Sequence, residues 1–379
     1  MIFSPLSGIY IHIPFCKQAC HYCDFHFSTN IDLKDKMVQM ICKELELQKL
    51  YLGEKAIIKT IYFGGGTPSL LSSVELGQIL NTLHQYYRLE IEELTIETNP
   101  DDLTPYKLIA LKELGFDRLS IGIQSFNDKV LKFYNRAHTA EESLRALEKA
   151  KNARFEKFSI DLMYGFPNTN HNIWKNDLKK AIELDPGHIS SYGLTIEPKT
   201  ALGRWAEKGS FTPPSEDFIA EQFEIMQDEL EKAGYVQYEI SNFGKPGAFA
   251  IHNTNYWVGI PYLGVGPSAH SFDGKSRQHN PSNNSRYIKS LEKGSLIFER
   301  EEIDKADALN EYLLTSLRTI WGADVTFIKN KYQVDLVAGK SKEIQQLVED
   351  GFMGIKDQKL SLTRKGKLLA DSIALKLFV

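Results

Sequence analysis

Three of the four cysteines in this 379-residue chain fall within eight residues, as Cys16-x3-Cys20-x2-Cys23. A disulfide framework places its cysteines throughout a short secreted chain, whereas this chain is long and begins without a basic region or a long apolar stretch. Three thiolates on one short loop can hold three corners of a cubane iron–sulfur cluster. A cubane has four irons, so one iron would keep an open coordination position, as a reactive cluster requires.

The same cysteines fit two other kinds of site less well. A structural zinc ion takes four ligands, and three nearby histidines could supply the fourth: His12, His21 and His26. Cys20 and Cys23 have the C-x-x-C spacing of a redox pair, but the third cysteine would then have no role. The remaining cysteine, Cys42, lies on the apolar face of a predicted helix and is expected to be a core thiol.

Two alternating hydrophobic periodicities in the first 200 residues predict the elements that position this loop. Short, β-branched apolar runs predict six strands: Gly8–Ile13, Ile58–Phe63, Leu94–Glu97, Arg118–Ile123, Phe158–Met163 and His188–Leu194. Helical periodicity lies between them: Asp32–Tyr51, Val74–Tyr87, Pro105–Leu114, Glu141–Ala153 and Asn172–Leu184. Six βα units in series predict an α/β fold with a parallel sheet, and we expect an incomplete (β/α)6 TIM-like barrel because a full barrel has eight units. An open doubly wound sheet is the alternative.

The predicted barrel would place the chemistry at one end. The cysteine loop directly follows the first strand, and the carboxyl ends of barrel strands carry active sites. A glycine run, Gly64–Thr67, follows the second strand, where glycine lets the backbone approach a ligand closely. No Lys-Ser/Thr pair follows Gly66, so a phosphate-binding P-loop is not expected.

The chain divides into three predicted parts: a partial barrel at 1–210, an extension at 211–298 and a C-terminal cap at 299–379. Thr212-Pro213-Pro214-Ser215 marks the first break, and a helix is predicted at Glu216–Ala233. Val236–Phe298 is rich in Gly, Pro, Asn and Tyr, which predicts loops with short strands. A hairpin around Lys356-Asp357-Gln358 followed by a helix suggests a winged-helix-like cap.

The overall composition is that of an ordinary globular protein, with 42% hydrophobic and 25% charged residues. The formal net charge of −4 provides no global basic field that would attract nucleic acid. No apolar run approaches the length of a membrane span, and we expect a cytoplasmic protein without a transmembrane segment.

An ordered series of motifs accompanies the cysteines. In chain order these are Tyr10-Ile11-His12-Ile13-Pro14-Phe15-Cys16, Gly64-Gly65-Gly66-Thr67-Pro68, Glu97-Thr98-Asn99-Pro100, Ile123-Gln124-Ser125-Phe126, Asn135-Arg136 and Asp161-Leu162-Met163-Tyr164-Gly165-Phe166-Pro167. The series resembles the radical S-adenosylmethionine (SAM) superfamily, and within it the anaerobic coproporphyrinogen III oxidase family, over essentially the whole chain. The resemblance implies a [4Fe–4S] cluster held by Cys16, Cys20 and Cys23, with SAM beside it.

The resemblance also implies a set of SAM contacts: Tyr10, Tyr22, Gly65, Gly66, Thr67, Glu97, Gln124, Arg136 and Asp161. In the family the glycine run and Glu97 contact the methionyl amino end. A guanidinium fork such as that of Arg136 suits the methionyl carboxylate. Gln124 and Asp161, at predicted strand ends, would bind the ribose hydroxyls. Taken singly, Arg136 could be a surface residue and Glu97 or Asp161 a helix cap.

Two departures separate the chain from the oxidases. They carry a further cysteine two residues past the third, where this chain has Phe25, and a longer N-terminal extension. In both respects the chain resembles the sister group of haem chaperones of the HemW type. That group's H-N-x-x-Y-W signature is present as His252-Asn253-Thr254-Asn255-Tyr256-Trp257. A neutral imidazole is a usual axial ligand of haem iron, so we expect His252 to contact haem; the alternative is a loop histidine beside core aromatics.

This resemblance implies a haem chaperone that passes haem to apo-haemoproteins such as respiratory enzymes and whose cluster draws on an electron donor. An oxygen-independent coproporphyrinogen III oxidase and a radical SAM methyltransferase are the alternatives. A further histidine, His270, could be a second haem ligand or a structural residue, and no residue is identified as catalytic.

Overall fold

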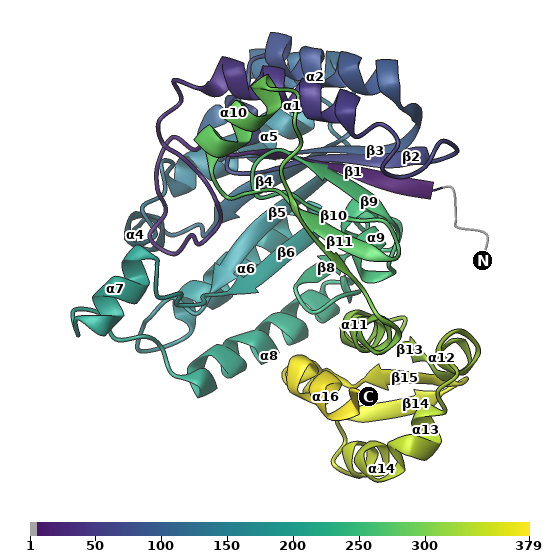
Figure 1. The fold of residues 1–379 in the computed structure, drawn as a ribbon. Coiled ribbons are helices and arrows are strands. Elements are labelled where there is room, and N and C mark those ends of the chain that lie inside the picture. Colours follow the sequence, from purple (N-terminus) through teal and green to yellow (C-terminus); the bar gives the residue numbers. More distant parts are fainter. Residues whose placement is uncertain (1–5) are drawn as a thin grey trace.

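The computed structural model describes residues 6–379, and a single parallel barrel sheet organises its first half. The six strands are β1 (Leu6–Ile13), β2 (Ile57–Gly65), β3 (Arg88–Thr98), β4 (Arg118–Gln124), β5 (Lys157–Tyr164) and β6 (Gly187–Gly193). They lie side by side in chain order, and each pair is parallel (Figure 1). A doubly wound sheet reverses its strand order at a switch point, so the sequential order confirms the incomplete barrel and excludes the alternative.

Helices connect these strands. They are α1 (Lys34–Leu47), α2 (Ser73–Tyr86), α3 (Pro105–Glu113), α4 (Asp128–Phe133), α5 (Ala140–Asn152) and α6 (Asn172–Leu184). Sequence periodicity missed α4, because six residues give less than two turns of pattern. Asn127 caps this helix by accepting a hydrogen bond from the Lys129 amide. Helix α4 matters because it delivers Asn135 and Arg136 to the end of the barrel.

The two faces of the barrel strands have different surroundings. On β1, Ile9, Ile11 and Ile13 are fully buried in the core formed with the surrounding helices. The residues between them alternate to the barrel interior; Tyr10 stacks there on Tyr62 of β2. The barrel interior is therefore partly polar, and the helix-facing side supplies most of the hydrophobic packing.

The residues between β6 and the C-terminal domain contribute strands to both edges of the barrel sheet. Their elements are α7 (Ala201–Glu207), α8 (Glu216–Lys232), β7 (Val236–Gln237), β8 (Asn242–Gly244), α9 (Ile251–Trp257), β9 (Tyr262–Val265), β10 (His270–Phe272), β11 (Ser276–His279), α10 (Asn284–Glu292) and β12 (Glu299–Glu302). Strand β8 pairs with β6, whereas β9 pairs in parallel with β1. The expectation of loops with short strands was wrong for α9 and α10, whose asparagines weakened the helical signal.

The C-terminal residues form a separate domain below the barrel (Figure 1). Its elements are α11 (Lys305–Leu317), β13 (Ala323–Asp324), α12 (Val325–Tyr332), α13 (Leu336–Gly339), α14 (Ser341–Glu349), β14 (Met353–Lys356), β15 (Lys359–Leu362), α15 (Arg364–Lys367) and α16 (Ala370–Leu377). It has a hydrophobic cluster of its own. Strands β14 and β15 form a hairpin whose turn residues, Asp357 and Gln358, both have positive φ. Strand β12 belongs to the barrel sheet, although the predicted cap began at residue 299.

Across residues 6–379, no helix has both the length and the apolar character needed to cross a bilayer.

Candidate functional site

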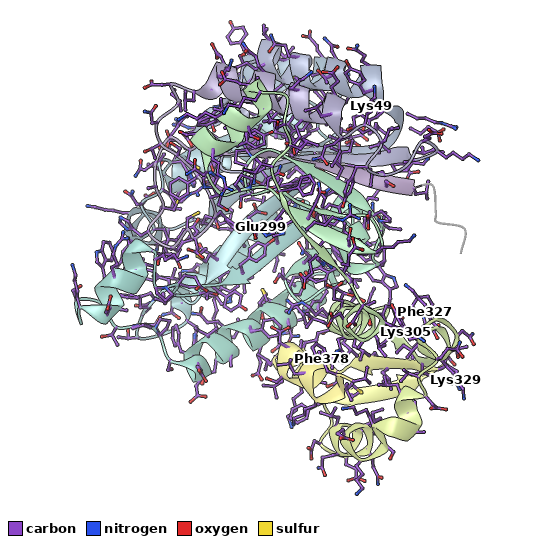
Figure 2. The ribbon with its side chains drawn as sticks, in the orientation of Figure 1. Lys49, Glu299, Lys305, Phe327, Lys329 and Phe378 are labelled. Atoms are coloured by element: carbon purple, nitrogen blue, oxygen red, sulfur yellow. The ribbon has the colours of Figure 1, made fainter. Side chains whose placement is uncertain are left out.

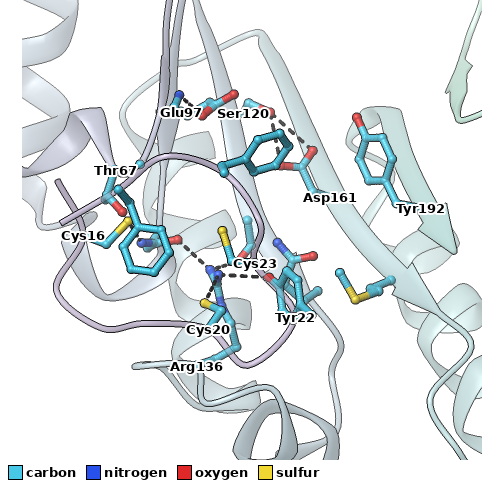
Figure 3. Close-up of a pocket in the computed structure, with 18 of the residues that line it drawn as sticks. Cys16, Cys20, Tyr22, Cys23, Thr67, Glu97, Ser120, Arg136, Asp161 and Tyr192 are labelled. Atoms are coloured by element: carbon cyan, nitrogen blue, oxygen red, sulfur yellow. Dashed lines mark hydrogen bonds between the residues drawn. The ribbon is translucent and has the colours of Figure 1, made fainter. Parts of the chain in front are cut away.

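A cavity of about 520 Å³ opens at the carboxyl ends of the barrel strands (Figure 3). It is lined by eleven of the residues predicted from the sequence: Cys16, Cys20, Tyr22, Cys23, Gly65, Gly66, Thr67, Glu97, Gln124, Arg136 and Asp161. Tyr10 is not part of this lining; its hydroxyl lies 3.2 Å from Nδ1 of His12, facing a second cavity. The volume falls within the range of small-molecule and cofactor sites.

Backbone hydrogen bonds hold the cysteine loop over this cavity. The Cys16 amide donates to the carbonyl of Ser28, at 3.0 Å, and the His21 amide donates to the carbonyl of Tyr134, at 3.1 Å. The side-chain amide of Asn135 donates to the carbonyl of Ala19, at 2.7 Å. The loop is therefore shaped before any metal binds, with its second half fastened to the end of α4.

The glycine run supports the start of that loop. Gly66 and Thr67 donate their amide protons to the carbonyls of Ile13 and Phe15, at 2.8 and 2.7 Å. A Cβ atom on Gly66 would lie 2.6 Å from the Phe15 carbonyl oxygen, closer than any side chain allows. The glycine at position 66 thus lets β2 pack directly against the chain that leads into Cys16.

The three thiols have the chemistry of cluster ligands. Burial raises the pKa of Cys16 and of Cys23 to about 11, so both are protonated near neutral pH and must lose protons to bind iron. Within residues 6–379 no three His, Cys, Asp or Glu side chains converge on one metal ion. The thiolates of a cubane would bind separate irons, whereas a structural zinc ion takes four ligands. The fourth cysteine, Cys42, packs against the hydrophobic core.

Glu97, at the end of β3, is a carboxyl group whose partners in the structure are neutral. Tyr62 Oη donates to Oε1 at 2.8 Å, and the Gly65 amide donates to Oε2 at 3.0 Å. Burial, reinforced by the charge of Asp161, raises the pKa of Glu97 to about 8 against these two hydrogen bonds. A carboxyl group with this environment fits the amino end of an amino-acid ligand.

Arg136 crosses the cavity beneath the cysteine loop (Figure 3). Its Nη2 donates to Asn99 Oδ1 and to the carbonyl of Gly122, at 2.6 and 2.8 Å. Its Nη1 lies 3.3 Å from Cys20 Sγ and 3.4 Å from Tyr22 Oη. Its Nε is buried without a hydrogen-bond partner in residues 6–379. An unpaired guanidinium nitrogen in a cavity fits a carboxylate ligand.

The opposite wall carries hydrogen-bonding groups from β4 and β5. Ser120 Oγ lies 3.3 Å from Asp161 Oδ1, and burial raises the pKa of Asp161 to about 6. Gln124 has a φ of 65°, a left-handed conformation that is rare for a residue with a side chain and that ends the strand abruptly. Both side chains reach the cavity, as expected for groups that would bind sugar hydroxyls.

Comparison with known proteins finds two family models and relatives that align over nearly the whole chain. Residues 10–181 match the family model for the radical SAM superfamily, and residues 303–369 match the HemN C-terminal domain. The "Heme chaperone HemW" of Bacillus subtilis is 33% identical over 97% of this chain and 98% of its own. That of Escherichia coli is 32% identical and covers all of both chains.

The chain belongs to the HemW family of radical SAM proteins. The solved coproporphyrinogen III oxidase (HemN) of Escherichia coli aligns with a TM-score of 0.86 at 22% identity, covering 100% of this chain and 91% of that chain. At that identity the likeness shows the shared fold alone.

The HemW signature lies on α9, at the floor of the barrel. His252 is 1% exposed; its Nδ1 pairs with Thr60 Oγ1 and its Nε2 with Tyr256 Oη, both at 2.8 Å. The ring of Trp257 lies beneath the guanidinium of Arg318, at 5.4 Å. A haem contact at His252 is therefore not preformed, because both ring nitrogens already have partners.

The cavity residues of this HemW-family chain that sequence reasoning missed include Asn99, Ser120 and Tyr192. Asn99 holds Arg136, Ser120 contacts Asp161, and Tyr192 stands at the end of β6. Asn99 follows the strand containing Glu97, and Tyr192 lies near the end of the last predicted barrel strand. Position at strand ends was the available signal, but it does not distinguish residues that face the cavity from those that face helices.

Proposed function

We propose that this protein is a haem chaperone that binds a [4Fe–4S] cluster, SAM and haem, and delivers haem to apo-haemoproteins such as respiratory enzymes. We place it in the cytoplasm, with a separate electron donor reducing the cluster. Support comes from its membership of the HemW family, whose relatives named as heme chaperones align over nearly the whole chain.

One observation carries the cofactor part of this proposal: the three thiols line the same cavity as a buried carboxyl group whose hydrogen-bond partners are neutral and an unpaired guanidinium nitrogen. Cys16, Cys20 and Cys23 would hold the cluster. Glu97 would bind the amino group of SAM and Arg136 its carboxylate. When bound, the two cofactors would supply one-electron chemistry at the sulfonium.

The protein's own residues would position the cofactors and exclude water from them. Asp161 and Gln124 would fix the ribose hydroxyls from β4 and β5. The cysteine loop, held at both ends by backbone hydrogen bonds, covers the cavity and limits access of solvent. These groups lie on strand ends, which keep their relative positions better than free loops do.

The test is an anaerobic assay of cluster-reconstituted protein. One sample receives haem and a haem-depleted b-type cytochrome, and transfer is followed by the acceptor's absorption spectrum. A parallel sample receives SAM, a reductant and coproporphyrinogen III, and its porphyrins are separated by chromatography. We expect haem transfer without porphyrinogen conversion. Formation of protoporphyrinogen would instead identify an oxidase.

A further inference from the structure

A second cavity of about 630 Å³ adjoins the cavity lined by Cys16, Cys20 and Cys23, which we call the cysteine cavity. The two share four residues at their common border: Asp24, Phe25, Gly65 and Glu97. The second cavity, which we call the histidine cavity, is lined by three histidines: His12, His26 and His270. These come from β1, from the segment after the cysteine loop and from β10, which tertiary folding brings together.

Aromatic side chains form the other walls of the histidine cavity. Tyr10, Tyr256 and Tyr262 line it, and the rings of Tyr256 and Tyr262 meet edge to face at 4.6 Å. At its rim Phe25 is 75% exposed, although a phenylalanine side chain gains free energy by burial. A large, flat ligand with apolar faces would cover Phe25 and fill the space between the tyrosines. The exposed cation Lys199 also lines the cavity and could pair with a carboxylate on such a ligand.

The second histidine of this cavity, His26, has one ring nitrogen fixed by a hydrogen bond. Its Nε2 lies 2.7 Å from Asn284 Oδ1, and an amide oxygen can only accept, so Nε2 carries the proton. A neutral imidazole with its proton on Nε2 keeps the metal-binding lone pair on Nδ1. A histidine ligand whose other nitrogen donates to a protein oxygen is the usual arrangement at metal sites. The ring of His12, with both nitrogens hydrogen bonded, lies alongside the ring of His26 and positions that residue.

His270 is the more accessible of the two candidate ligands. It is exposed at the start of β10, and its ring lies 5.2 Å from the ring of His279. Partial burial, with the nearby His279 and Arg277, lowers the pKa of His270, so the neutral imidazole is favoured. His252, in contrast, is buried in the barrel floor with both nitrogens occupied.

We propose that the histidine cavity is the tetrapyrrole site of this protein, with the iron bound by His270 and assisted by His26, and with Lys199 pairing to a propionate. This inference rests on the proposed function, because it requires that the protein binds haem. It places the tetrapyrrole directly beside the cysteine cavity, across the shared residues Gly65 and Glu97.

The experiment titrates the full-length, cluster-reconstituted protein with ferric haem under anaerobic conditions and follows the Soret band. We expect His270→Ala to weaken haem binding at least tenfold and to shift the Soret band, and His26→Ala to weaken it less. Added imidazole should restore the wild-type spectrum of His270→Ala, which a purely structural defect would not allow.

Two variants serve as matched controls. His279→Ala removes the imidazole next to His270 that does not line the cavity, and it should bind haem within twofold of wild type. His252→Gln retains hydrogen-bonding groups in the barrel floor and should also bind normally. Wild-type protein that bound no haem would overturn the proposed function and this inference with it. Normal binding by His270→Ala and His26→Ala, with a loss in His252→Gln, would overturn the histidine cavity alone.

Discussion

At the scale of single residues, the cysteine cavity contains carboxyl groups whose buried surroundings disfavour the charged form. Burial raises the pKa of Glu97 from 4.5 to about 8, so the folded protein binds a proton between these values that the unfolded chain releases. Stability of the cofactor-free protein should therefore fall as pH rises from about 4.5 to 8. Such costs are common at binding sites, where the ligand supplies the missing partner.

Replacing Glu97 by Gln should remove the part of this pH dependence that Glu97 causes. Each pKa unit corresponds to about 1.4 kcal/mol, and allowing for water in the cavity we expect the variant to gain about 2 kcal/mol over wild type at pH 8 and little at pH 4.5. Urea unfolding of cofactor-free protein at both pH values measures the difference. Glu54→Gln, on an exposed loop, is the matched control. A variant that gained as much at low pH would show that desolvation of the charge is not the cause.

Cys20→Ala should lose the cluster. With one thiolate removed, the reconstituted protein should contain less than a tenth of the wild-type iron and sulfide, measured chemically and by absorbance near 400 nm. Cys42→Ala removes a cysteine that packs on the core and should keep the full content. Equal iron in the two variants would refute the cluster assignment.

At the scale of elements, a buried ion pair joins α9 to the barrel. Arg118 Nε donates to Glu93 Oε2 at 2.8 Å, and Glu93 also accepts the His252 amide at the start of α9. Arg118 further donates to the carbonyls of Ala248 and Phe249, at 3.1 and 3.2 Å. The helix with the HemW signature is thus fixed by charges on β3 and β4, which explains why His252 faces the barrel interior.

Arg118→Met should therefore destabilise the protein by about 3–5 kcal/mol, because it leaves the Glu93 carboxylate buried and unpaired. Lys36→Met breaks an ion pair of similar length, 2.8 Å to Glu292, that is exposed to solvent. It should cost less than about 1 kcal/mol. Chemical denaturation of both variants measures their free energies of unfolding. Similar losses of stability in the two variants would mean that Arg118 acts by packing rather than by charge.

At the scale of the whole molecule, polar contacts and the apolar side chains of Ile240 and Leu368 join the C-terminal domain to the barrel. Arg318 of this domain pairs with Glu239 at 3.6 Å and covers the Trp257 ring at 5.4 Å. Lys367 Nζ contacts the carbonyl of Gln237 at 3.3 Å. Since each part has its own hydrophobic cluster, the domain interface is the weaker junction.

Arg318→Ala should loosen this junction without unfolding either part. We expect faster hydrogen exchange in α9 and α11, several-fold over wild type, and little change in β1–β6, measured by mass spectrometry. Lys329→Ala is the control, because Lys329 lies on the outer side of the C-terminal domain and pairs only with Asp335 there (Figure 2). Equal exchange in both variants would show that Arg318 does not hold the interface.

The sequence alone determined the repeating units and much of the cysteine cavity. Buried strands and amphipathic helices have local periodicities, so six βα units and their order were predictable, and barrel geometry then placed the cysteines, Glu97 and Asp161 at one end. Eleven of the twelve residues predicted around the cluster and SAM line one cavity.

Tertiary structure decided what depends on contacts distant in sequence. Pairing of β9 with β1 brings His270 into one cavity with His26, and the Arg118–Glu93 pair directs His252 into the barrel floor. The same packing turns Tyr10 toward the histidine cavity rather than the cysteine cavity. Local periodicity specifies which face of a helix or strand is buried. It does not specify which distant element covers that face, because long-range strand pairing and the neutralisation of buried charge decide this.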